Sequence, residues 1–207
     1  MRVAVVGGTG PFGIALATRL RDAAGYEVVI GSRDAERATT VAAEIGVAGA
    51  TNDDAVRGAQ LVVLATKADA ALETARDLRE AIGATPVLSV ASELRVTPEG
   101  VFPCTDSTSL AERIRVELDA PVVAGLHSLA ASSLGGDEAP DEDAFVCGDD
   151  AHAKTLALEL AEQITVGRAI DAGPLASARA LEGLTAVLVS VNKRYRVHAG
   201  LKVTGLG

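Results

Sequence analysis

Three glycines near the N-terminus have the spacing of a phosphate-binding loop. Residues 7–13 read GGTGPFG, and Gly8, Gly10 and Gly13 fit the pattern G-x-G-x-x-G. In that pattern the first glycine forms a tight turn, the second lets backbone N–H groups approach a pyrophosphate, and the third lets a helix pack on a strand. The start of that helix adds partial positive charge for the phosphates. The spacing predicts a nucleotide site, and a glycine-rich turn without a ligand is the alternative.

The end of the second expected strand indicates which nucleotide this loop selects. A site for NAD places Asp or Glu about 20 residues after the loop, where the carboxylate binds the ribose hydroxyls. This chain has Ser32 and Arg33 there, and Arg37 follows one helical turn later. A hydroxyl and two guanidinium groups suit a 2′-phosphate, because they bind it through charge-assisted hydrogen bonds. We therefore expect NADP(H); the alternative is an exposed helix start in which Asp34 and Glu36 pair with the arginines.

A glycine loop of this type needs a strand before it and a helix after it. In the first half of the chain, short β-branched runs alternate with segments that carry apolar residues at helical spacing. The expected strands are residues 3–6, 27–30, 61–64 and 86–89, and the expected helices are residues 12–24, 35–45 and 68–82. This alternation predicts a parallel sheet with helices on both faces and right-handed crossovers. The loop then lies between a strand and a helix, as nucleotide binding requires.

The second half of the chain is less regular. Residues 92–109, which contain two prolines and a glycine, are expected to form a loop ahead of a helix at 110–118. The other expected elements are strands at 122–125, 145–147 and 168–171, helices at 151–163 and 175–191, and an acidic loop at 135–143. We expect a Rossmann-type α/β fold with a doubly wound parallel sheet. Residues 1–120 would form the NADP-binding domain, and residues 121–207 a smaller C-terminal part that faces the substrate.

Composition narrows the class of protein. The chain has 207 residues, of which 48% are hydrophobic and 23% charged, so a globular core is expected. A formal net charge of −9 and an aromatic content of 2% argue against nucleic-acid binding, which needs basic surface or stacking aromatics. No apolar run reaches the ~18 residues of a membrane span, and no signal peptide is recognised. We expect a cytoplasmic protein that binds neither nucleic acid nor membrane.

The sequence shows no nucleophile, base and acid at catalytic spacing, and no metal-binding cluster. Cys104 and Cys147 are far apart, so we expect neither a zinc site nor a disulfide framework. His127 follows an expected strand, at the sheet edge where α/β proteins bind ligands; a structural histidine is the alternative. Arg194 and Arg196 belong to a basic tail after the last helix. There they either receive an anionic ligand or stabilise the helix C-terminus.

Taken together, these residues resemble the NADPH:coenzyme F420 oxidoreductases, which exchange hydride between NADP(H) and a 5-deazaflavin. The resemblance runs nearly from end to end and includes CGDD at 147–150, DAGPL at 171–175 and the tail at 192–200. It implies that coenzyme F420 is the co-substrate and that the protein is a homodimer. Hydride transfer between two bound rings needs orientation and exclusion of water rather than covalent chemistry, which agrees with the residues that are missing.

The resemblance also implies roles for individual residues. The pyrophosphate would lie among Thr9, Gly10, Pro11 and Phe12, and the 2′-phosphate would lie on Ser32, Arg33 and Arg37. Thr66, Ala70 and Ala131 would line the path towards the nicotinamide. On the acceptor side, His127 would be the polar group at the mouth of the deazaflavin cleft, and the best candidate for a catalytic residue, while Ala199 would touch the deazaflavin. Arg194 and Arg196 would receive its phosphodiester and glutamate groups.

The chain departs from the family pattern at two positions beside the expected acceptor. Lys67-Ala68 stands where the family commonly has Pro-Trp, and Leu129 follows His127-Ser128 where the family commonly has proline. Lys67 either contacts an anionic acceptor or extends into solvent. Two other functions therefore stay open. The first is NADPH-dependent reduction of another anionic cyclic substrate, such as a biosynthetic relative of coenzyme F420, and the second is non-catalytic sensing of NADP(H).

Overall fold

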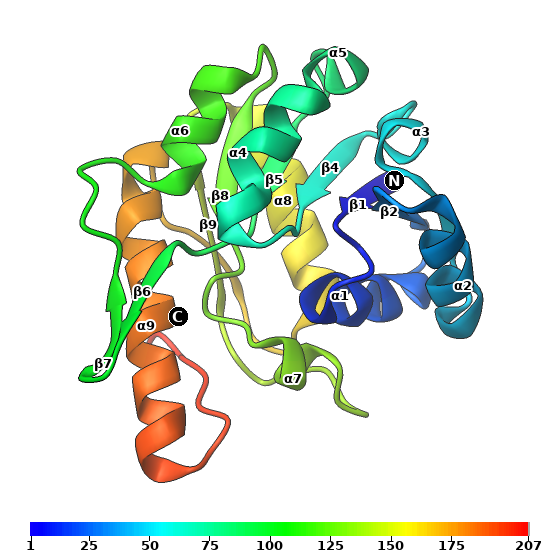
Figure 1. Ribbon diagram of the computed structural model, residues 1–207. Helices are drawn as coiled ribbons and strands as arrows, with labels where there is room; N and C mark the ends of the chain where they lie inside the picture. Colours follow the sequence, from blue (N-terminus) through cyan, green and yellow to red (C-terminus); the bar gives the residue numbers. More distant parts are fainter. Residues whose placement is uncertain (207) are drawn as a thin grey trace.

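An eight-stranded sheet forms the centre of the computed structural model, which describes residues 1–206 (Figure 1). Its strands are β1 (Arg2–Val6), β2 (Glu27–Ser32), β3 (Ala48–Thr51), β4 (Leu61–Leu64), β5 (Val87–Ser89), β8 (Val122–Gly125), β9 (Ala144–Gly148) and β10 (Ala169–Asp171). They lie in the order β10-β9-β8-β5-β4-β1-β2-β3. The pairs are parallel except for β8 with β9, which is antiparallel. The predicted Rossmann-type sheet is confirmed, with one antiparallel pair that the sequence did not indicate.

Helices cover both faces of this sheet. The first face carries α1 (Pro11–Arg21), α2 (Ala35–Ile45), α7 (Ala131–Leu134) and α8 (Ala151–Ile164). The second face carries α3 (Asn52–Val56), α4 (Ala68–Asp77), α5 (Arg79–Ile82), α6 (Leu110–Glu117), the 3₁₀ turn η1 (Leu175–Ser177) and α9 (Ala178–Tyr195). Two apolar cores result, one on each side of the sheet.

Strand β1 shows why an unbroken apolar run forms a central strand. Successive side chains of a strand point to opposite faces. Val3 and Val5 enter the core under α1 and α8, whereas Ala4 and Val6 enter the core under α4 and α6. All four residues have no exposed surface. A strand that is buried on both faces requires apolar residues at every position, which is the pattern of parallel sheets in α/β proteins.

The strand order places one group of loops at a single edge of the sheet. β1 lies between β2 and β4, so the chain winds to one side of β1 and then to the other. Ligands of open α/β sheets bind at this switch point, outside the carboxyl ends of the strands. The loops after β1, β2, β4, β5 and β8 all leave from those ends, because these strands run in the same direction. Most of the site residues that we predicted from the sequence lie in these loops.

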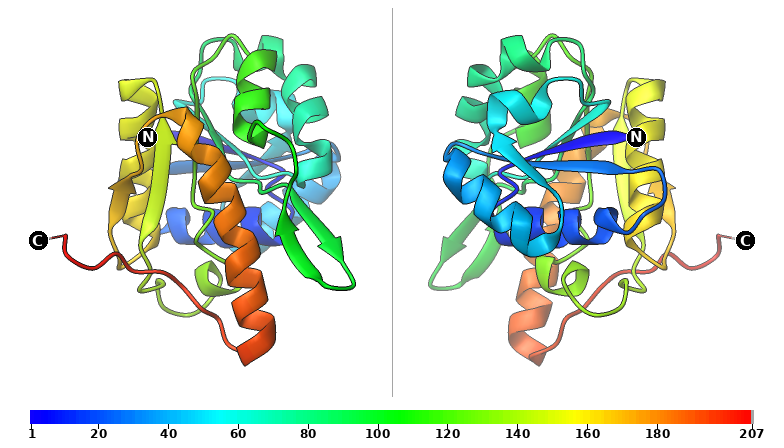
Figure 2. Two further views of the ribbon diagram at one scale, coloured as in Figure 1. Left: turned by 90° about the vertical axis from the view of Figure 1, so that its left-hand side faces the viewer. Right: turned by 90° about the vertical axis from the view of Figure 1, so that its right-hand side faces the viewer.

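Several elements differ from the expectation. The expected loop at 92–109 contains an antiparallel ribbon of β6 (Leu94–Thr97) and β7 (Gly100–Pro103), which lies beside α9 (Figure 2). Of the residues that indicated a loop, Pro98 lies in the turn of this ribbon, and Gly100 and Pro103 are the first and last residues of β7. The expected helix at 68–82 divides into α4 and α5 at Leu78, and the expected helix at 175–191 begins as η1 and continues to Tyr195. Strand β3 was not expected.

The sheet continues across residue 120, where we expected a domain boundary. β8, which begins at Val122, pairs with β5, and β9 and β10 extend the same sheet. A division between residues 1–120 and 121–207 therefore stays a prediction about function. Within residues 1–206, no helix has both the length and the apolar character to cross a membrane.

Candidate functional site

The glycine loop after β1 needs three of its glycines for packing within the protein. Gly7 has a φ of +76°, and a Cβ there would lie 3.0 Å from the backbone of Thr66. A Cβ on Gly8 would lie 2.6 Å from the Cβ of Ile30, and a Cβ on Gly13 would lie 2.6 Å from the Cα of Gly8. The third glycine of the pattern thus lets α1 close on the loop, as expected. These contacts fix the path of the backbone.

Gly10 differs from the other three, because a side chain there would meet only one atom of the protein. A Cβ at this position would meet only the carbonyl oxygen of Gly7, at 3.3 Å. Gly10 is also the residue before α1 and makes no side-chain cap, while Pro11 occupies the first helical position. The first turn of a helix has N–H groups without partners in the helix, which suits an anion. The loop therefore leaves room for a pyrophosphate where packing does not require glycine.

The predicted 2′-phosphate residues follow β2 in a turn ahead of α2. Ser32 is buried at the end of β2, and its Oγ accepts the N–H of Asp34 at 3.2 Å. Asp34 caps α2 by accepting the N–H of Arg37 at 3.1 Å. Arg33 and Arg37 are exposed, and within residues 1–206 neither forms an ion pair. The ion pairs of Asp34 and Glu36 with these arginines, which the alternative included, are therefore absent among the described residues, while the segment is an exposed helix start, as that alternative expected.

Three predicted residues follow β4. Thr66 packs against Gly7, and its Oγ1 is buried without a hydrogen-bond partner in the part of the chain that the structure describes. Lys67 is exposed as the residue before α4, and Ala70 is half-buried in the first turn of that helix. A buried hydroxyl without a partner costs free energy, so its position beside the glycine loop fits a polar group of a bound nucleotide.

His127 lies in the loop between β8 and α7. It is 5% exposed, and neither ring nitrogen has a hydrogen-bond partner among the described residues. Burial lowers the pKa of His127 to about 4, and the nearby Ala91 carbonyl offsets this only in part. The imidazole is therefore neutral at pH 7. Leu126 has a φ of +65°, a conformation that residues other than glycine adopt at a cost and that is frequent at functional sites.

The remaining acceptor-side residues divide into two groups. Ala131 opens α7, and the next residue, Ser132, contacts the C-terminal segment through a 3.1 Å hydrogen bond to Nδ1 of His198. Ala199 is next to His198, so it is close to α7. Arg194 instead lines an apolar groove of about 500 Å³ between β7 and α9. Arg196 ends α9 with a φ of +55°. The hydrogen bond between Ser132 and His198 brings the segments that carry Ala131 and Ala199 together, and no described contact joins Arg194 or Arg196 to them.

The structure adds residues that sequence reasoning missed. Ser89 ends β5, is fully buried, and its Oγ has no partner among residues 1–206. A serine at the end of an apolar strand was visible in the sequence and was not selected. Ser128 donates a 2.8 Å hydrogen bond to the carbonyl oxygen of Asp143, which fixes the loop that carries His127. No sequence pattern indicates that contact.

One cluster outside this edge has metal-ligating side chains. Glu93, Cys104 and Asp106 lie together, with their ligand atoms within 4.8 Å of one another. Arg113 donates to Glu93 and forms a 3.2 Å ion pair with Asp106. Because the guanidinium of Arg113 contacts both carboxylates, the cluster is explained by an ion-pair network.

Comparisons with known proteins extend over the whole chain. A family model described as NADP oxidoreductase coenzyme F420-dependent matches residues 2–93. The F420-dependent NADP reductase of Methanothermobacter thermautotrophicus is 36% identical over all of this chain and 96% of that protein. The F420-dependent NADP reductase of Methanocaldococcus jannaschii is 32% identical over all of this chain and 99% of that protein. A crystal structure from Arthrobacter sp. FB24, described as a candidate F420-dependent NADP reductase, has a TM-score of 0.84 at 28% identity and 99% coverage of both chains.

Proposed function

The chain belongs to the family of coenzyme F420-dependent NADP oxidoreductases, and we propose that the loops at the carboxyl edge of its sheet hold the two reactants. The protein is an oxidoreductase that transfers hydride between NADP(H) and coenzyme F420. The observation that carries this conclusion is the identity of 36% along the entire chain, since the glycine loop alone is common to many reductases.

The nucleotide half of the site has residues that suit each phosphate group of NADP(H). We propose that the pyrophosphate lies over Gly10 at the start of α1, among Gly8, Thr9, Pro11, Phe12 and Gly13. A Cβ on Gly10 would have a single neighbour within 4 Å, the carbonyl oxygen of Gly7 at 3.3 Å, so a ligand can approach the backbone where a side chain would stand. Ser32, Arg33 and Arg37 would bind the 2′-phosphate. The absence of an ion pair on either arginine, within residues 1–206, supports this role, because both charges are available to an anion.

The acceptor half is a proposal of the same kind. Thr66, Ala70 and Ala131 would line the path towards the nicotinamide, and the acceptor would contact Lys67, His127, Arg194, Arg196 and Ala199. When bound, NADPH supplies the hydride and the oxidised deazaflavin accepts it. The protein itself holds the two reacting rings in position. Rigid loops after β1, β4 and β8 fix the two rings, and a neutral His127 provides a hydrogen bond rather than a proton at pH 7.

We also propose a homodimer, which the family resemblance implied, and a cytoplasmic location, which was expected from the sequence. Six exposed apolar side chains are concentrated on the β6–β7 ribbon, on α9 and just beyond its end: Val96, Phe102, Val187, Val189, Tyr195 and Val197. Exposed apolar side chains concentrated in neighbouring elements are typical of protein contact surfaces. In functional terms, residues 1–120 would bind NADP(H) and residues 121–207 would form the acceptor side, while the dimer contact would use residues of both parts.

A spectrophotometric assay tests the function. The purified protein is mixed with NADPH and oxidised coenzyme F420, and the deazaflavin absorbance is followed. We expect the band to bleach with NADPH, and far more slowly with NADH at the same concentration. Oxidation of NADPH with other acceptors alone would indicate a different reductase. Binding of NADPH without turnover of any acceptor would indicate a sensing protein.

A further inference from the structure

The C-terminal segment 197–206, which we call the strap, turns back after α9 and crosses the body of the protein (Figure 2). Arg196 makes the turn possible by adopting a left-handed conformation at the end of α9. The N–H of Ala199 then donates a 2.6 Å hydrogen bond to Oδ1 of Asn192, which holds the strap against the helix it has just left. The strap therefore has a defined path, although most of its side chains are exposed.

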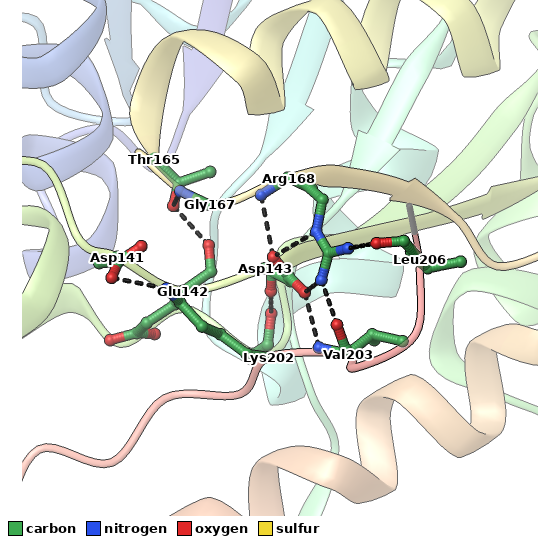
Figure 3. Close-up of polar contacts among 10 residues, drawn as sticks. Asp141, Glu142, Asp143, Thr165, Gly167, Arg168, Lys202, Val203 and Leu206 are labelled. Atoms are coloured by element: carbon green, nitrogen blue, oxygen red, sulfur yellow. Dashed lines mark hydrogen bonds and ion pairs between the residues drawn. The ribbon is translucent and has the colours of Figure 1, made fainter.

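Asp143 is the residue on which the strap is anchored (Figure 3). Its carboxylate accepts the N–H of Val203 at 2.7 Å, the N–H of Arg168 at 2.9 Å and the guanidinium of Arg168 at 2.8 Å. Its own N–H donates to the carbonyl oxygen of Leu201 at 2.7 Å. Arg168 also donates to the carbonyl oxygens of Val203 and Leu206. The side chain of Asp143 is 1% exposed, so this is a buried and fully partnered carboxylate.

Two further contacts guide the strap. Gly200 passes directly over Glu142, and a Cβ on Gly200 would lie 2.1 Å from the Cγ of that side chain. Only glycine allows this close approach. Nearer to α9, His198 bonds to Ser132 of α7. The strap thus touches α7 as well as the segment that leads into β9.

The same anchor reaches the predicted acceptor site. The carbonyl oxygen of Asp143 accepts the hydroxyl of Ser128, the residue after His127. Ser132, which contacts the strap, is the residue after Ala131. Asp143 therefore links the strap, through one residue, to the loop between β8 and α7, and His198 links it to the start of α7.

We propose that Asp143 and Arg168 are positioning residues that hold the strap against the loop between β8 and α7, so that the strap forms one wall of the acceptor site. This inference rests on the proposed function, because it assigns that edge to the acceptor. The wall would govern binding of the deazaflavin and leave NADP(H) binding at the glycine loop unchanged. An ion pair with this many hydrogen bonds serves placement, since a buried pair contributes little net stability.

The test compares Arg168→Gln with the unmodified protein and with Arg79→Gln. Arg79 forms a 3.0 Å ion pair with Asp119 outside the strap, and that pair is exposed and contributes little. We expect Arg168→Gln to accelerate hydrogen exchange in residues 197–206 and to raise the KM for coenzyme F420 by about tenfold or more, as misplacement of a binding wall does. Its KM for NADPH should be unchanged. Arg79→Gln should behave as the unmodified protein.

Because Arg168→Gln leaves a buried carboxylate unpaired, it can destabilise the fold. A chain that ends at Gly200 keeps the Asp143–Arg168 pair and removes the anchored part of the strap, so it should show the same increase in acceptor KM. If the strap is released in Arg168→Gln, or removed by the truncation, and the KM for coenzyme F420 is unaltered, the inference is overturned. Unaltered hydrogen exchange in Arg168→Gln would overturn the anchor. Absence of coenzyme F420 turnover in the unmodified protein would instead contradict the proposed function.

Discussion

Arg37 reaches from α2 back to the glycine loop, where its Nη2 lies 3.5 Å from the carbonyl oxygen of Thr9. The contact joins the segment predicted to bind the 2′-phosphate with the segment predicted to bind the pyrophosphate. Asp34 and Ser32 fix the turn that carries Arg37, because each accepts a backbone N–H within it. The guanidinium therefore lies between the segments predicted to bind the two phosphate groups of one nucleotide.

Replacing both arginines should remove the preference for NADPH. A hydrogen bond to a charged group contributes about 1.5–3 kcal/mol. The double variant Arg33→Ala, Arg37→Ala should therefore bind NADPH at least about tenfold more weakly, since 1.4 kcal/mol is a factor of ten. Its affinity for NADH should not change, and calorimetric titration of both nucleotides measures the two effects. Arg79→Ala, which removes an exposed arginine paired with Asp119, is the control. Equal losses for NADPH and NADH would contradict the assignment.

Gly10 and Gly8 should respond differently to the same substitution. Gly10→Val adds a side chain where the protein has open space and where the pyrophosphate is predicted to lie, so NADPH binding should be lost while the melting temperature changes little. Gly8→Val brings a Cβ within 2.6 Å of Ile30, so it should destabilise the fold itself by about 1–3 kcal/mol or more. Circular dichroism melts and calorimetry separate the two outcomes. Normal NADPH binding by a folded Gly10→Val would show that the loop has been misassigned.

Much of the fold follows from local patterns in the sequence. Strands such as β1 and β4 are recognisable because burial on both faces demands apolar residues without interruption. β3 was missed because its residues, 48–51, are mostly small and only partly buried. The β6–β7 ribbon was missed because its turn residues resemble those of a loop. The antiparallel pairing of β9 with β8 depends on the path of the chain through α7 and the acidic loop, and no local pattern records that path.

The candidate site also has a part that the sequence predicts and a part that it does not. The glycine loop and Ser32 to Arg37 are contiguous segments, so their residue types and spacing predict their role, and the geometry there is consistent with it. Ser128, Asp143, Arg168 and Val203 come from four separate parts of the chain. Their contacts arise from tertiary packing, which spacing along the sequence cannot indicate.

Burial of His127 should make stability depend on pH. Its pKa in the folded protein is about 4, below the ordinary 6.5, so between these values the unfolded chain binds a proton that the folded protein does not. The stabilisation that comes from a neutral, buried His127 should therefore be fully present above pH 6.5. The free energy of unfolding should fall as the pH is lowered towards 4. The shift of 2.5 units corresponds to a loss of about 3 kcal/mol at most, at 1.36 kcal/mol per unit.

Denaturant unfolding at several pH values measures this dependence. The curve of unfolding free energy against pH should be flatter for His127→Gln than for the unmodified protein in that window. His152→Gln, which replaces an exposed histidine in the first turn of α8, should leave the slope as it is. An identical slope in His127→Gln would show that His127 binds protons equally in the folded and the unfolded protein, which contradicts the lowered pKa.

Substitution of the basic residues at the end of α9 should distinguish a role in acceptor binding from a role in helix stabilisation. Lys193 and Arg194 occupy the last turn, and Arg196 follows as the cap, so all three could stabilise the helix dipole, an effect of only about 0.3–1 kcal/mol. If Arg194 and Arg196 receive the phosphodiester and glutamates of the acceptor, their charge reversal should act mainly on binding. We expect the double variant Arg194→Glu, Arg196→Glu to raise the KM for coenzyme F420 several-fold and to leave the KM for NADPH unchanged. The increase should shrink as salt is added, because exposed charges are screened over about 8–10 Å at physiological ionic strength.

A variant with the same net charge, Arg79→Glu with Arg115→Glu, should show neither effect. A lower melting temperature with both KM values unaltered would leave these arginines the helix-stabilising role alone.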